Sequence, residues 1–78
     1  MNPRVKDVKA KENYILYLTF DNAEIKKFDM KPYIEKGFFK QLKEVNYFYS
    51  VQVFMGTVQW PNGQDLCPDT LYEDSLDF

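Results

Sequence analysis

The sequence predicts an α+β fold, a small antiparallel sheet of about five strands with short helices packed on one face. Apolar side chains alternate over residues 14–20, which is typical of a strand. Residues 61–63, Pro-Asn-Gly, suit the three loop positions of a hairpin in which Trp60 faces Gln64. Pro68 has a fixed φ and no N–H, so it fits the first turn of a short helix over residues 69–74.

Three strands are expected in the N-terminal half. Residues 5–11 carry lysines on both faces, which suits the edge of a sheet, where charge discourages pairing with another molecule. Residues 14–20 are apolar on both faces and are expected to form a central strand. In residues 24–29, Ile25 and Phe28 have opposite parity. We therefore expect a bulge near residues 26–27 that places both on one face.

The turn before this third strand has an unusual residue. The chain reverses at residues 21–23, Asp-Asn-Ala. If this hairpin uses the same three-residue loop as the one at residues 61–63, Ala23 occupies the left-handed position that glycine prefers.

The middle of the chain predicts helical structure. Pro32 opens a single helical turn through Glu35, and Gly37 is placed to end it in a left-handed conformation. Apolar residues then recur at helical spacing over residues 38–49. This pattern predicts one amphipathic helix, or two shorter ones, with the apolar side in the core.

A second hairpin is expected over residues 51–60, with its turn at Met55 and Gly56. This register pairs Val53 with Val58 and Val51 with Trp60, and so gathers four apolar side chains on one face. With Leu66 they form the expected buried face of the sheet, packed against Phe38, Leu42 and Leu71.

Composition indicates one domain over residues 1–78, in which the acidic residues 73–78 are expected to fray. With 45% hydrophobic residues and one cysteine, the chain must fold by an apolar core rather than by disulfides. The N-terminal residues are too charged for a signal peptide, and no apolar run is long enough to span a membrane, so a cytoplasmic protein is expected. All ten lysines and arginines lie in residues 1–43, and we expect the basic and acidic halves to interleave.

The residue types needed for most chemistry are missing. The absence of histidine and the single Cys67 exclude His-based triads, Cys–His nucleophiles and Cys/His zinc sites. The three glycines are far apart, so there is no glycine-rich phosphate loop. The sequence therefore predicts a protein that is not an enzyme, with no catalytic residues, no cofactor and no metal.

A protein partner, or self-association, is the leading expectation. Ile15, Tyr17 and Phe54 lie on the non-core side of their strands by parity, together with small uncharged polar residues. Aromatic and aliphatic side chains without charge match the centre of an interface better than an ordinary surface. The alternative is that the helical segment covers this face and leaves the other one exposed.

Two other functions compete with this interpretation. Six basic residues of the first strands are candidates for a nucleic-acid patch: Arg4, Lys6, Lys9, Lys11, Lys26 and Lys27. A pI of about 5.0 and an acidic second half oppose it. The third candidate is a small-molecule sensor that uses a tyrosine-lined cleft between sheet and helices.

The motifs resemble those of a known family. They are Asn-Pro-Arg-Val-Lys at residues 2–6, the strand at 14–20, Phe28-Asp29, Gly-Phe-Phe at 37–39, Gly-Thr-Val-Gln-Trp-Pro-Asn-Gly at 56–63, Asp65-Leu66, and Pro-Asp-Thr-Leu-Tyr-Glu at 68–73. In these residues the chain resembles the bacterial domain of unknown function 2442, which usually has Asn-Gly where this chain has Asn22-Ala23.

The resemblance implies a small α+β fold. Some members of that family carry an added helix-turn-helix domain, and many are encoded beside another small protein in an arrangement like a toxin–antitoxin pair. The family has no established active site, so no functional residues are carried over. The sequence therefore predicts a non-enzymatic interaction or regulatory module, one member of a two-protein pair.

Overall fold

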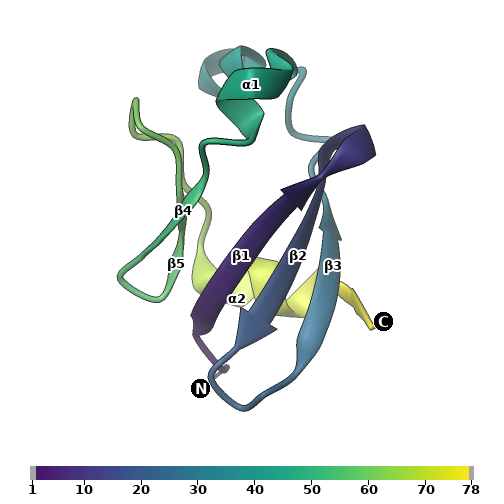
Figure 1. The fold of residues 1–78 in the computed structure, drawn as a ribbon, viewed down its shortest axis with the longest axis vertical. Helices are drawn as coiled ribbons and strands as arrows, with labels where there is room; N and C mark the ends of the chain where they lie inside the picture. Colours follow the sequence, from purple (N-terminus) through teal and green to yellow (C-terminus); the bar gives the residue numbers. More distant parts are fainter. Residues whose placement is uncertain (1, 78) are drawn as a thin grey trace.

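The computed structural model describes residues 2–77 and confirms the α+β class (Figure 1). The strands form two antiparallel sheets. The larger sheet has the order β1-β2-β3-β6, formed by Val5–Lys11, Ile15–Phe20, Ile25–Asp29 and Leu76–Asp77. The smaller sheet pairs β4 (Gln52–Phe54) with β5 (Thr57–Gln59). The helices are two 3₁₀ segments, η1 (Glu12–Tyr14) and η2 (Gly37–Lys43), and two short α-helices, α1 (Val45–Phe48) and α2 (Pro68–Glu73).

Strand β2 is the central strand that its sequence predicts, and only one of its faces is covered. Leu16, Leu18 and Phe20 are fully buried, whereas the residues between them are partly exposed. Helix α2 lies across the buried face (Figure 1), where the ring of Tyr72 meets that of Phe20 edge-on with centroids 5.1 Å apart. None of the elements described in residues 2–77 lies over the other face of this sheet (Figure 1).

Strand β2 begins at Ile15 rather than at Tyr14 because two residues of the connection from β1 have a left-handed backbone conformation. Asn13 and Tyr14 have φ of 63° and 60°, a conformation that costs a bulky residue energy. Tertiary contacts hold Tyr14 there: its hydroxyl donates to the carbonyl of Lys43 at 2.6 Å, and its ring meets Phe48 edge-on at 5.3 Å.

The predicted bulge near Lys26 and Lys27 is wrong. The β2–β3 register runs without interruption, so Phe28 is buried while Ile25 stays 51% exposed on the opposite face. An irregularity lies in β1 instead, between Val5 and Asp7, and it leaves Lys6 as the extra residue. The turn between β2 and β3 matches the prediction that Ala23 is left-handed, because this residue has a φ of 74°.

The segment predicted to be helical over residues 38–49 is broken into two. Gly37 has the expected left-handed φ of 46°, and η2 and α1 are separated at Glu44, whose backbone is extended (φ −71°, ψ 114°). The Glu44 side chain accepts a hydrogen bond from the Asn46 N–H at 3.1 Å and so caps α1. Leu42 is fully buried as expected, but Phe38 is 60% exposed and lies outside the core.

The two hairpins of the C-terminal half have the predicted registers. Val53 pairs with Val58 in β4–β5, and Trp60 pairs with Gln64 through a backbone hydrogen bond of 2.9 Å. Val58 and Trp60 are buried, and the indole N–H of Trp60 donates to the carbonyl of Phe48 at 2.9 Å. Val53 is 36% exposed, so the expected burial of this residue is wrong.

Strands β4 and β5 do not extend the larger sheet. They pack against its edge strand β1, where the Val5 N–H donates to the carbonyl of Gly56 at 2.9 Å. A Cβ at position 56 would lie 3.0 Å from Cδ of Arg4, so the arginine side chain would have to shift to make room for it. The φ of 82° at Gly56 is a conformation that glycine adopts without strain. The two sheets share one hydrophobic core.

The acidic C-terminal segment joins the sheet of the basic N-terminal half. It was expected to fray, but Leu76 and Asp77 pair with Lys27 and Lys26 as β6. The remaining residue of the expected tail, Phe78, lies outside the described residues. Basic and acidic parts of the sequence therefore lie side by side in one sheet. This agrees with the expectation that the two halves of the chain interleave.

Candidate functional site

The uncovered side of the four-stranded sheet, which we call the open face, consists of three rows of paired residues. Asp7, Thr19 and Ile25 form one row, Lys9, Tyr17 and Lys27 the next, and Lys11, Ile15 and Asp29 the third. Residues that pair across strands project to the same side of a sheet. Leu76, which pairs with Lys27, adds an apolar side chain at the β6 edge.

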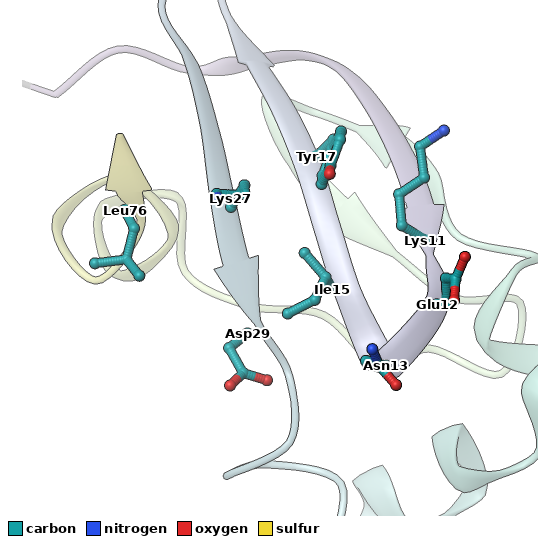
Figure 2. A pocket seen from close by; sticks show the side chains of 8 residues that line it. All are labelled: Lys11, Glu12, Asn13, Ile15, Tyr17, Lys27, Asp29 and Leu76. Atoms are coloured by element: carbon teal, nitrogen blue, oxygen red, sulfur yellow. The ribbon is translucent and has the colours of Figure 1, made fainter. Parts of the chain in front are cut away.

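Tyr17 stands between two shallow hollows of the open face. One, of about 440 Å³, is lined by Lys11, Glu12, Asn13, Ile15, Tyr17, Lys27, Asp29 and Leu76. Figure 2 shows Tyr17 and Ile15 on β2 in this hollow, with Lys11 and Lys27 on the strands to either side. The other, of about 460 Å³, is lined by Asp7, Lys9, Tyr17, Thr19 and Ile25.

The open face has an apolar centre and a rim of mixed charge. Ile25 and Leu76 are 51% and 68% exposed, so they add apolar surface to that of β2. The ammonium of Lys11 lies 5.6 Å from the ring centroid of Tyr17, within the range of a cation–π contact. Asp29 forms an ion pair with Lys31 at 3.0 Å. The expectation of an uncharged face therefore holds only for the residues of β2 itself.

Sequence reasoning missed two apolar members of this face, Ile25 and Leu76. The opposite parity of Ile25 and Phe28 was the available signal, because a strand without a bulge must expose one of the two. The expectation of a bulge at residues 26–27 explained this opposite parity without exposing either residue, and so hid the signal. Leu76 could not be placed, since pairing of so short a segment with β3 depends on how α2 packs.

Phe54 does not join Ile15 and Tyr17, so the predicted three-residue interaction face is wrong as a single surface. Phe54 is 50% exposed on β4 and borders a separate hollow of about 210 Å³ with Gln52, Gln59, Trp60 and Pro61. The prediction assumed a single sheet, whereas β4 and β5 form their own. Thr57, from the same expected face, is buried and donates its hydroxyl to the carbonyl of Leu66 at 2.5 Å.

The predicted basic patch is also divided. Lys9, Lys11 and Lys27 lie on the open face beside Asp7, Glu12 and Asp29. Lys26 projects to the other side, where its ammonium lies 4.5 Å from the ring centroid of Tyr72. The Arg4 stem packs on Gly56, and Lys6 is the extra residue of the β1 irregularity. Neighbouring residues of a strand face opposite ways, so the six side chains do not gather.

A cluster that shifts the pKa values of two side chains lies away from the open face, where α2 meets the β2–β3 hairpin. The hydroxyl of Tyr72 and the amide of Asn22 both donate to Oε1 of Glu24 at 2.5 Å. These two bonds, the one from Tyr72 first, lower the pKa of Glu24 below its ordinary value. The same bond to Glu24 raises the pKa of Tyr72. The cluster attaches α2 to the hairpin, which is a structural role.

Within residues 2–77, no group of three or more His, Cys, Asp or Glu side chains is arranged to hold a metal ion. None of the helices described is long and apolar enough to cross a membrane. Cys67 is exposed and free.

Comparison with known proteins identifies the family but no individual relative. Neither the curated proteins nor the solved structures include a significant match to this chain. One family model matches residues 5–76, which begin with β1 and reach β6, and so include both sheets and the open face. The chain therefore belongs to the family described as "Protein of unknown function (DUF2442)".

Proposed function

We propose that this chain is a non-catalytic protein-interaction module, one member of a two-protein regulatory pair, and that it binds through the open face. The observation that carries the proposal is an exposed apolar strip on a sheet face that none of the described helices covers. Ile15 and Tyr17 are partly exposed in this strip, and Ile25 and Leu76 are more than half exposed. An apolar centre with a charged rim is the usual composition of a protein–protein interface.

The shape of the face supports contact with a macromolecule rather than with a small ligand. Sites for small molecules bury most of the ligand in a cleft or cavity. The two hollows beside Tyr17 are shallow depressions of the sheet surface. A partner that covers both hollows would bury Tyr17, and large aromatic side chains at the centre of an interface contribute most to affinity.

The nucleic-acid alternative has less support. Phosphate binding favours a patch of one sign, whereas the lysines of the open face alternate with Asp7, Glu12 and Asp29. Retention of the protein on a heparin column at low salt, lost as the salt concentration rises, would favour this alternative over a protein partner.

The test compares two aromatic residues, one on each sheet: Tyr17, which is partly exposed, and Phe54, which is 50% exposed. Tyr17→Ala removes the centre of the open face, and Phe54→Ala is the matched control on β4. In pull-downs from the native cell extract, we expect Tyr17→Ala to weaken capture of the partner by about 2 kcal/mol or more, roughly 30-fold in affinity. Phe54→Ala should bind as the wild type does.

Circular dichroism of both variants shows whether they remain folded. Loss of binding by Phe54→Ala, with Tyr17→Ala unaffected, would place the contact surface on the second sheet and refute the proposal.

A further inference from the structure

We propose that the occupant of the open face is a second copy of this chain, in a symmetric dimer in which each Tyr17 enters the hollow beside the partner's Thr19 and Ile25. This inference rests on the proposed function, since the second copy uses the same face that the other protein of the pair would bind. It depends on two properties of the face, its shape and the order of its charges.

The hollows of the open face are placed for a symmetric contact. Tyr17 is partly exposed and lines both hollows, one of which lies at the next row of the sheet, around Thr19 and Ile25. A two-fold axis that crosses the strands at the level of Leu18 exchanges the row of Tyr17 with the row of Thr19. Each tyrosine then faces the hollow of the other copy. Both copies use the same surface, so the contact is isologous and forms a closed dimer.

The charges follow the same symmetry. The row of Tyr17 contains Lys9, and the row of Thr19 contains Asp7. The axis at Leu18 therefore places Asp7 opposite the partner's Lys9, and by symmetry the pair occurs twice. Lys27 comes opposite the partner's Ile25, so that its methylene stem covers an exposed apolar side chain and no like charges face each other in these two rows.

A partner of one sign would fit this face less well. A strongly acidic surface would be repelled by Asp7 and Asp29, and a strongly basic one by the three lysines of the face. Alternating charge needs a partner whose charges alternate in the complementary order, and the two-fold copy supplies it. The face spans only a few short strands. We therefore expect the contact to bury less than the roughly 1,200 Å² at which standard-size interfaces begin, and the dimer to be weak and reversible.

The experiment is sedimentation equilibrium of the purified full chain, from micromolar to about 1 mM concentration, with a charge-swap series. Asp7→Lys and Lys9→Asp each place like charges across the interface, and each should raise the dissociation constant about tenfold or more. The double variant, Asp7→Lys with Lys9→Asp, restores opposite charges and should dimerise as the wild type does. Lys40→Asp, on η2 away from the sheet face, is the control for net charge.

Two outcomes would overturn the inference. One is a wild-type protein that stays monomeric at every concentration. The other is a dimer in which the double variant is no tighter than the single ones. The proposed function is tested separately: a monomeric protein that loses an extract partner through Tyr17→Ala would refute self-association and leave the interaction module in place.

Discussion

Ala23 and Gly63 occupy equivalent positions in two hairpin loops of the same geometry. The N–H of Ala23 donates to the carbonyl of Phe20 at 2.9 Å, and that of Gly63 donates to the carbonyl of Trp60 at 2.9 Å. Both residues are left-handed, with φ of 74° and 102°. Glycine adopts this conformation without strain, whereas a Cβ makes it unfavourable by about 1 kcal/mol. The first hairpin therefore carries strain that the second lacks.

Ala23→Gly is expected to stabilise the protein by about 1 kcal/mol, because it removes this strain. For a domain of this size the melting temperature should rise by roughly 4–8 °C. Ala10→Gly is the matched control: Ala10 lies in the extended strand β1, where glycine should destabilise by about 0.5–1 kcal/mol. Thermal denaturation of the two variants measures both effects. A lower melting temperature for Ala23→Gly would show that the alanine is not left-handed in solution.

Trp60→Ala is expected to remove a large part of the stability of the domain. Trp60 is 1% exposed, stacks on Phe48 with ring centroids 6.0 Å apart and donates its indole N–H to the Phe48 carbonyl. Truncation of a buried tryptophan costs about 3–5 kcal/mol, against a total of about 5–15 kcal/mol for a native domain. Urea denaturation measures the loss.

The fluorescence of the wild-type protein gives an independent check on this assignment. Trp60 is the only tryptophan, and its burial predicts blue-shifted emission that acrylamide quenches slowly. Red-shifted and readily quenched emission from the folded protein would contradict the packing of Trp60 on Phe48.

Tyr72→Phe should make the stability of the protein less sensitive to acid. The hydrogen bonds to Glu24, that of Tyr72 first, hold the pKa of its carboxyl below the ordinary value of 4.5. A lowered carboxyl pKa stabilises the folded state above pH 4.5, and this contribution is lost as the pH falls through the folded pKa. The phenylalanine variant keeps the ring against Phe20 but has no hydroxyl to donate to Glu24.

Urea denaturation of wild type and Tyr72→Phe at pH 7 and at pH 3 tests this, with Tyr33→Phe as a control away from Glu24. We expect the stability difference between wild type and Tyr72→Phe to shrink towards pH 3. In alkali the same bond raises the pKa of Tyr72 above 10.0, so its contribution is present below pH 10 and is lost as the pH rises through the folded pKa. An unchanged difference at pH 3 would show that the bond to Glu24 does not form in solution.

The sequence alone determined part of the local structure of this protein. The two loops that end in Ala23 and Gly63, the β4–β5 register and the start of α2 at Pro68 all follow from backbone preferences and side-chain parity within a few residues. These preferences act wherever the segment lies in the fold. The partly exposed positions of Ile15 and Tyr17 followed from the same parity.

Only the tertiary structure decided how the segments meet. Gly56 packs against Arg4 and Val5, but β4 and β5 form a sheet of their own, and this separates Phe54 from Tyr17. Pairing of Leu76 with Lys27 completes the open face. These contacts join residues far apart in the chain, and their energies depend on the packing of the whole core. For that reason the parity of residues within single strands predicted that Ile15 and Tyr17 lie on the open face. It did not predict which other strands contribute to that face.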